Sequence, residues 1–107
     1  MTERRNLTVE VFGALSDPVR LDLLAHIAAS GPICVCHLEE ALPYQQPRIS
    51  KHLAVLRRAG LVTTRREGNW VYYSLEAQAL EIARDFVDQL ERSMHVPHLT
   101  GVCEEPE

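Results

Sequence analysis

The sequence predicts a mainly α domain with one β-hairpin, an α+β fold with its elements in the order α-α-α-α-β-β-α. Apolar residues recur at helical spacing in several segments, Gly and Pro separate those segments, and two β-rich runs flank a Glu-Gly-Asn turn. Two short helices that are joined by a tight turn and followed by a hairpin form a winged helix-turn-helix. No repeat or internal linker is visible, so residues 1–95 are expected to form one domain, followed by a tail over residues 96–107.

The first two helices are predicted on either side of a Ser-Asp-Pro sequence. A short helix is expected from Asn6 to Ala14. Ser16 and Asp17 can cap the second helix, because their side chains accept hydrogen bonds from its first N–H groups, and Pro18 suits the first helical position. Gly31 ends this second helix. Four of its residues form the expected buried stripe: Leu21, Leu24, Ile27 and Ala28.

The third and fourth helices are short and lie on either side of a Pro-Tyr-Gln-Gln turn. The third is expected over Val35 to Leu42 and ends at Pro43. The fourth has Pro47 near its first turn and Gly60 as its C-terminal stop. Its expected core residues are Ile49, Leu53 and Leu56.

The hairpin and a long last helix complete the predicted fold. The segments Leu61 to Glu67 and Trp70 to Leu75 are expected to be its two strands. The last helix is expected from about Glu76 to His95. It carries six apolar residues at helical spacing: Leu80, Ala83, Phe86, Val87, Leu90 and Met94.

The net charge of −4 is unevenly distributed along the chain. Residues 48–66 contain six basic residues and no Asp or Glu, so this segment carries +6 and the remainder carries −10. A positive stripe on an acidic body indicates a surface that binds a polyanion, although a solvated helix face gives the same pattern. Because the stripe coincides with the fourth helix and the hairpin, we expect the polyanion to be double-stranded DNA.

Eight side chains are candidates for contact with this DNA. The fourth helix could reach base edges and phosphates in the major groove, and the hairpin could approach the flanking minor groove. The candidates are Gln46, Arg48, Ser50, Lys51, His52, Arg57, Arg65 and Arg66. The apolar stripes of the first and last helices exceed what one small core needs. They indicate a symmetric dimer and a palindromic DNA site, with intramolecular packing as the alternative.

Several classes of protein are disfavoured by the sequence. No run of 18 apolar residues is present, so no membrane span is expected. The N-terminal segment lacks the apolar core and cleavage site of a signal peptide, and an odd number of cysteines, three, argues against a secreted disulfide framework. We therefore expect a cytoplasmic protein. No hydrolytic triad or phosphate-binding loop is visible, so we expect a protein that is not an enzyme.

Cys34 and Cys36 lie one residue apart at the start of the third predicted helix. Two helical residues at this spacing point about 200° apart around the axis. Their sulfurs can therefore meet at one ion only if Cys34 precedes the helix and Cys36 lies in its first turn. Thiolates bind soft ions, so the pair is a candidate ion site beside the DNA-reading helix. The alternative is two small buried structural cysteines.

Four segments resemble the arsenic-repressor (ArsR/SmtB) family of bacterial winged-helix repressors. They are LSDPVRLDLLAHI, CVCHL, RISKHLAVLRRAGLV and RREGNWVYYSL, which together span about Phe12 to Leu75. The resemblance implies a homodimeric repressor that needs no cofactor to bind operator DNA. It also implies that a bound metal or metalloid releases the DNA. The CVC pair marks the branch of the family that senses soft ions.

The resemblance implies Cys34 and Cys36 as ligands for trivalent arsenic or antimony. Both elements favour three sulfurs, and where this branch often has a third cysteine the chain has Glu39. Cys103 in the tail is the candidate third ligand, from its own or the partner subunit, and His37 is a further candidate. The family's zinc site on the last helix is not carried over, because only half of its Asp-x-His…His-x-x-Glu pattern is present, at Asp85 and His98.

Other interpretations of the thiol pair remain. Within the family, the ion could be cadmium, lead or zinc. From a different class, the pair could serve a dithiol oxidoreductase, but a disulfide between residues two apart would be strained and no thioredoxin-like βαβ pattern surrounds it. A repressor that is switched by thiol oxidation lies between these alternatives.

Overall fold

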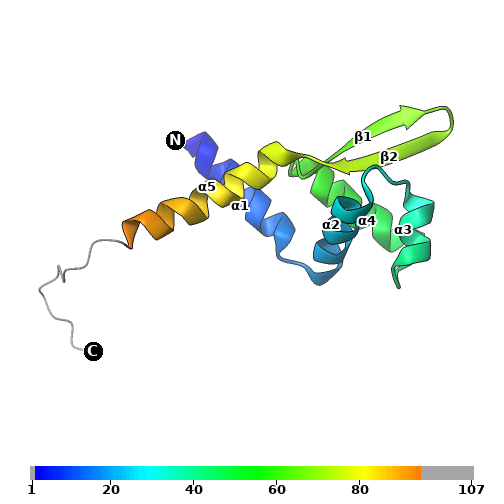
Figure 1. The fold of residues 1–107 in the computed structure, drawn as a ribbon, viewed down its shortest axis with the longest axis horizontal. Helices are drawn as coiled ribbons and strands as arrows, with labels where there is room; N and C mark the ends of the chain where they lie inside the picture. Colours follow the sequence, from blue (N-terminus) through cyan, green and yellow to red (C-terminus); the bar gives the residue numbers. More distant parts are fainter. Residues whose placement is uncertain (1, 95–107) are drawn as a thin grey trace, which may run out of the picture.

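A computed structural model describes residues 2–94 of the chain. In this part, five helices and one antiparallel hairpin follow one another in the predicted order, which confirms the fold class (Figure 1). The elements are α1 (Thr2–Leu15), α2 (Pro18–Ser30), α3 (Val35–Ala41), α4 (Gln46–Arg58), β1 (Val62–Glu67), β2 (Trp70–Leu75) and α5 (Ala77–Ser93). None of the described helices is long and apolar enough to cross a membrane. The predicted tail, with Cys103, lies outside the described residues.

The start of α2 is fixed by Asp17. Its carboxylate oxygen Oδ2 accepts hydrogen bonds from the backbone N–H groups of Val19, at 2.9 Å, and Arg20, at 3.1 Å. Burial raises the pKa of Asp17, but these two hydrogen bonds, together with the nearby charges of His52 and Arg20, hold the pKa below its usual value. The helix ends at Gly31, whose φ of 78° lies in the region that favours glycine. The predicted cap and stop are therefore both confirmed.

The core lies between α2, α3, α4 and the base of the hairpin. Its fully buried side chains include the three residues expected from α4: Ile49, Leu53 and Leu56. The expected stripe of α2 is only partly correct. Leu24 and Ile27 are buried, but Ala28 is exposed, Leu21 is 50% exposed, and Leu23 is completely buried instead. Apolar residues occur on several sides of α2, so their spacing alone does not show which side meets α1 and α4.

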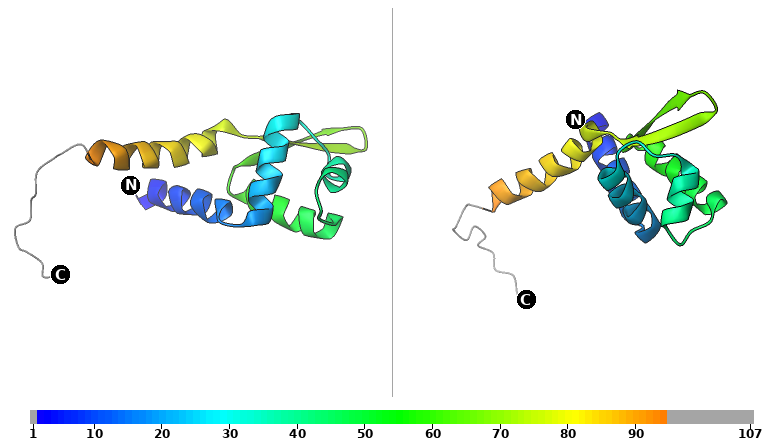
Figure 2. Two further views of the ribbon diagram at one scale, coloured as in Figure 1. Left: turned by 60° about the horizontal axis from the view of Figure 1, so that its bottom comes forward. Right: turned by 45° about the vertical axis from the view of Figure 1, so that its right-hand side comes forward.

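α1 packs against α5, and the two helices run side by side away from the rest of the fold (Figure 2). α1 begins earlier than predicted and buries Val11 and Ala14. Phe12 of α1 meets Phe86 of α5 edge to face, with ring centroids 5.8 Å apart. Three apolar residues of α5 and its C-cap residue nevertheless remain 41–78% exposed: Phe86, Val87, Leu90 and Met94.

The hairpin projects from the helices as a two-stranded wing (Figure 1). Its register pairs Val62 with Leu75 and Glu67 with Trp70, and Gly68 adopts a φ of 63° in the turn. The other edge of β2 pairs with a single residue of the loop before α3. Ile33 and Tyr73 exchange two backbone hydrogen bonds, 3.1 and 2.8 Å long. The chain that leads into the Cys-Val-Cys segment is therefore attached to the wing.

Candidate thiol site and nucleic-acid interface

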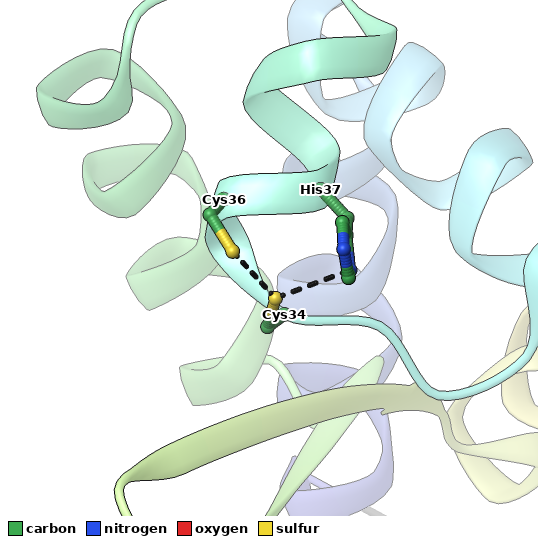
Figure 3. Close-up of side chains that lie close together, drawn as sticks. All are labelled: Cys34, Cys36 and His37. Atoms are coloured by element: carbon green, nitrogen blue, oxygen red, sulfur yellow. Dashed lines mark hydrogen bonds between the residues drawn. The ribbon is translucent and has the colours of Figure 1, made fainter.

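The two thiols converge at the start of α3. Cys34 is the N-cap residue, with extended backbone angles of φ −92° and ψ 165°, and Cys36 lies in the first turn of the helix. This is the arrangement that the spacing required for both sulfurs to meet. The two Sγ atoms are 2.9 Å apart, and both cysteines are free (Figure 3).

A third donor atom joins the pair. Nδ1 of His37 lies 3.3 Å from Sγ of Cys34, and the donor atoms of all three side chains lie within 4.8 Å of one another (Figure 3). Cys34 is buried, with 3% of its surface exposed, whereas Cys36 and His37 are exposed. Among residues 2–94, no other group of three His, Cys, Asp or Glu side chains is close enough to hold one ion.

The two thiols differ in acidity because of their surroundings. Burial raises the pKa of Cys34, but hydrogen bonds from the Cys36 thiol and from the N–H groups of His37 and Cys36 outweigh it and lower the pKa below the usual value. The pKa of Cys36 is raised, first by its hydrogen bond to Cys34 and then by burial. Cys34 is therefore the sulfur that loses its proton first, which is the state that binds a soft ion.

The donor set of this site is two sulfurs and one imidazole nitrogen. Thiolates select soft ions, and imidazole suits zinc and similar borderline ions. The residues present therefore fit a thiophilic ion. Cys103, the predicted third sulfur, is outside the described residues, and the position of the family's third cysteine is occupied by Glu39.

The exposed face of α4 carries most of the predicted DNA contacts. Gln46, Arg48, Lys51 and Arg57 are exposed, and Ser50 is half-buried and accepts a hydrogen bond from the Gln46 amide at 3.3 Å. The guanidinium of Arg48 lies over the ring of Tyr44, 5.2 Å from its centre. The Tyr44 hydroxyl in turn donates to Asp22 of α2 at 2.6 Å. Arg48 is thus supported by a cation–π contact rather than extended freely into solvent.

His52 differs from the other candidates on α4. Its side chain is only 15% exposed, and its Nδ1 accepts a hydrogen bond from Nη1 of Arg20 at 3.1 Å. Arg20 also donates from Nε to the carbonyl of Ala14 at 2.8 Å, so it links α1, α2 and α4. Asp17 Oδ2 lies 3.9 Å from the same His52 nitrogen. The sequence did not indicate Arg20 as a linking residue, because its partners are distant in the chain.

The wing presents both predicted arginines. Arg65 and Arg66 are exposed on β1, and as neighbours in a strand they point to opposite faces of the hairpin. Arg65 forms an ion pair with Glu67 at 3.0 Å. In the part of the chain that the structure describes, Arg66 has no ion-pair partner, which leaves its charge available to a phosphate.

The fold and these two surfaces define a winged helix-turn-helix protein with a thiol site beside its recognition helix. Residues 17–64 match the bacterial regulatory proteins of the arsR family. Three relatives are 37–40% identical to this chain, and the match spans more than two thirds of the length of each of them. The chain therefore belongs to this family. Members of the family are DNA-binding regulators of transcription and not enzymes. This confirms both the expectation that the protein is not an enzyme and the resemblance to the ArsR/SmtB family.

Individual relatives support the same assignment. The arsenic resistance transcriptional regulator ArsR1 of Pseudomonas putida is 48% identical over 64% of this chain, a match that spans about half, 53%, of that protein. The arsenical resistance operon repressor of Escherichia coli is 39% identical over 78% of this chain and 71% of its own length. A homodimeric winged helix-turn-helix DNA-binding domain from Mycobacterium bovis superimposes with a TM-score of 0.65 at 29% identity, covering 89% of both chains.

Proposed function

We propose that this protein is a cytoplasmic, homodimeric repressor that releases its operator DNA when Cys34 and Cys36 bind trivalent arsenic or antimony. The observation that carries the proposal is the 2.9 Å separation of the two sulfurs at the start of α3, the helix that precedes α4. The names of the Pseudomonas and Escherichia relatives, both linked to arsenic resistance, support the choice of ligand.

The DNA contacts come from α4 and the wing. α4 enters the major groove, where Gln46, Arg48, Ser50 and Lys51 contact base edges and phosphates. Arg57 contacts the backbone, and the wing places its arginines near the flanking minor groove. His52 contributes by holding α4 against α2 through Arg20, and any contact it makes with DNA is secondary to that role. No cofactor is needed for this binding.

The dimer is formed by α1 and α5. The exposed apolar residues belong to α5, which with α1 forms an arm at the opposite end of the molecule from α3 and the tip of the wing (Figure 2). A second copy of the chain would cover them and place two α4 helices on one side of the dimer. A two-fold axis of this kind matches a palindromic operator, in which each half-site meets one copy.

The switch acts through the short path between the sulfurs and the DNA. An ion held by both thiolates fixes the conformation of the first turn of α3, and α3 packs directly on α4. Operator release follows if this fixed conformation does not fit the position that α4 takes on DNA. Inorganic arsenite and antimonite favour three sulfurs, and we propose Cys103 as the third, from either subunit.

The test is an operator-fragment titration with arsenite and antimonite. Cys34→Ser and Cys36→Ser should each bind the operator like the wild type, because a repressor binds DNA without its inducer. Each should fail to release it, because one remaining thiolate cannot chelate the ion. Cys103→Ser should weaken the response to inorganic arsenite strongly and the response to phenylarsine oxide less, since the phenyl carbon already occupies one coordination position. Release of Cys34→Ser by arsenite at the wild-type concentration would overturn the proposal.

A further inference from the structure

We infer that Arg48 reads one guanine in each half of the operator, and that Tyr44, held by Asp22, positions the Arg48 guanidinium for this contact. The inference rests on the proposed function, because it requires α4 to enter the major groove of operator DNA. It goes further by naming the base that one side chain recognises and the two residues that support this side chain.

Arg48 lies where a recognition helix reaches base edges. It is the third residue of α4, after Gln46 and Pro47, and its side chain is exposed. The N-terminal residues of a recognition helix contact the bases when the helix lies in the major groove. Ile49, the next residue, is completely buried, so this turn of α4 is anchored to the core. Arg48 therefore projects from a fixed point of the helix.

The guanidinium of Arg48 lies over the ring of Tyr44. Its Cζ atom is 5.2 Å from the ring centre. The Tyr44 hydroxyl donates a hydrogen bond to Oδ2 of Asp22 at 2.6 Å, and the half-buried ring packs against the core. The ring is therefore held at its polar end and along its apolar body. A side chain that is ordered before DNA arrives loses less conformational entropy on binding.

The contact with Tyr44 leaves the N–H donors of Arg48 available. A cation–π contact uses no N–H group, whereas an ion pair with a carboxylate does. Among residues 2–94, Arg48 forms no ion pair, whereas Arg65 is paired with Glu67 at 3.0 Å. Arginine has five N–H donors and no acceptor. Guanine presents two acceptors, O6 and N7, side by side in the major groove, so it is the base that two arginine donors fit.

The neighbouring polar side chains of α4 are less suited to this role. The amide of Gln46 donates to the Ser50 hydroxyl at 3.3 Å, and His52 accepts a hydrogen bond from Arg20 at 3.1 Å. Lys51 is exposed but carries a point charge on a flexible chain, without the planar fork of arginine. Arg48 is thus the side chain of this turn that combines free donors with a supported position.

The test begins with the selection of binding sites for the full chain from duplexes of random sequence. The wild type should select sites with a guanine at one fixed position in each half. Arg48→Ala should lose the preference at this position and keep the preferences elsewhere. Replacing this guanine in one half-site should weaken wild-type binding by about 5- to 140-fold, the range typical of a bidentate arginine–guanine pair. Arg48→Ala should distinguish the two duplexes by less than about twofold.

Two modified bases separate contact with the guanine edge from a general effect on the duplex. In 7-deazaguanine the N7 acceptor is absent, whereas hypoxanthine keeps N7 and O6 and lacks the amino group in the minor groove. The first should weaken wild-type binding roughly tenfold, as expected for one hydrogen bond from a charged donor. The second should leave it within about twofold. Arg48→Ala should bind the duplexes with guanine and with either modified base equally.

Two variants control for the loss of positive charge. Arg57→Ala removes another exposed arginine of α4 and should weaken binding to all sequences alike, with a decrease of about 0.9 in the slope of log affinity against log salt. Arg48→Lys keeps the charge without the planar fork, so it should keep the salt slope and lose part of the guanine preference. Uniform weakening by Arg48→Ala, with a reduced salt slope, would assign Arg48 to a phosphate and overturn the inference.

Variants of Tyr44 test the positioning role. Tyr44→Leu keeps an apolar side chain at this half-buried position but removes the ring, and should lower discrimination for the guanine about two- to fivefold. Tyr44→Phe keeps the ring and loses the hydrogen bond to Asp22, so it should lower discrimination less. Circular dichroism checks that both are folded. A merely structural role would lower affinity for every sequence alike, and unchanged discrimination in Tyr44→Leu would refute the positioning by Tyr44.

Titration of the selected duplex with arsenite separates this inference from the proposed function. If arsenite releases the duplex but Arg48→Ala keeps the guanine preference, the proposed function stands and the inference is refuted. If Arg48→Ala loses this preference but arsenite does not release the duplex, the guanine contact stands and the proposed switch is refuted. If the wild type selects no sequence, both are refuted.

Discussion

The carboxylate of Glu39 accepts a hydrogen bond from the backbone N–H of Gln46, with 3.3 Å between Oε2 and the nitrogen. Glu39 lies on α3, one turn after the thiols, and Gln46 is the first residue of α4. The N-cap residue of α4, Gln45, contributes no side-chain cap, so Glu39 supplies an acceptor that the start of α4 otherwise lacks. The helix with the thiols is thus bonded to the first turn of the proposed DNA-reading helix.

Replacing Glu39 should weaken this connection. We expect Glu39→Ala to lower the free energy of unfolding by about 0.5 kcal/mol, which is typical of removing a favourable charge from a helix N-terminus. It should also weaken operator binding two- to fivefold and raise the arsenite concentration needed for release, because one of the links between α3 and the start of α4 is lost. Chemical denaturation and operator anisotropy measure both effects. Glu40→Ala, the neighbouring acid, is the control, and identical behaviour of the two variants would contradict the connection.

The two wing arginines should contribute unequally to DNA binding. Arg66→Ala should lower operator affinity more than Arg65→Ala, because Arg65 is already paired with Glu67 at 3.0 Å. Removing one arginine–phosphate interaction should reduce the slope of log affinity against log salt by about 0.9. Arg92→Ala, in the last turn of α5, is the control for a general decrease in positive charge. An unchanged slope in the Arg65→Ala/Arg66→Ala double variant would exclude the wing from the interface.

Leu90→Asp should convert the proposed dimer to monomers. Leu90 is 52% exposed on α5, in the apolar stripe that we assign to the partner copy. An ionised carboxylate placed in that interface would lose its water without gaining a partner, which costs far more than the leucine contributes. Sedimentation at micromolar concentration should show a dimer for the wild type and for Gln78→Asp at the start of α5. A dimeric Leu90→Asp protein would move the interface elsewhere.

The thiol pair should titrate in two separated steps. In a Cys103→Ser background, thiolate absorbance should rise once below and once above the usual cysteine pKa, since the pKa of Cys34 is lowered and that of Cys36 is raised. Stabilisation of the fold by the Cys34 thiolate is fully present above the usual pKa and is lost as the pH falls through the lowered pKa. Cys36→Ala removes the hydrogen-bond donor and should raise the pKa of Cys34. A single step at the usual pKa would contradict the coupling.

Leu23 and Leu21 provide a matched pair on α2. Leu23→Ala should lower the free energy of unfolding by about 2–5 kcal/mol, because it leaves a cavity at a fully buried position. Leu21→Ala, at a half-exposed position, should cost less than about 1 kcal/mol. Denaturant unfolding measures both. Similar losses of stability would mean that Leu21 is covered in the protein as it exists in solution, for example by the partner subunit.

Local signals were sufficient to predict the elements of this fold. Asp17 and Pro18 specify the start of α2 through cap chemistry that involves only neighbouring residues. Gly31 and Gly60 adopt positive φ where a helix ends, and Gly68 adopts it where the hairpin reverses direction. The convergence of Cys34 and Cys36 followed from helix geometry, because only one placement of the helix start allows the sulfurs to meet.

The features that the sequence did not predict depend on packing between elements. The buried side of α2 is selected mainly by its packing against α4 and β2, so the exposure of Leu21 could not be inferred from spacing. His52 lies on the predicted reading helix, yet Arg20 holds it from another helix, 32 residues away in the chain. The bond from Glu39 to Gln46 is equally invisible in the sequence, since it depends on the angle at which α3 meets α4.

The backbone pairing of Ile33 with Tyr73 connects the thiol site to the wing, in addition to the contact of α3 with α4. Ile33 immediately precedes Cys34, and its two hydrogen bonds to Tyr73 attach this point of the chain to the outer edge of β2. A displacement of Cys34 would therefore pull on the wing while a displacement of the α3 turn shifts α4. Both elements that we propose to contact DNA would then shift relative to the duplex in one concerted step. The affinity for operator DNA would then fall because two elements each fit the duplex slightly less well, and not because one element is displaced far.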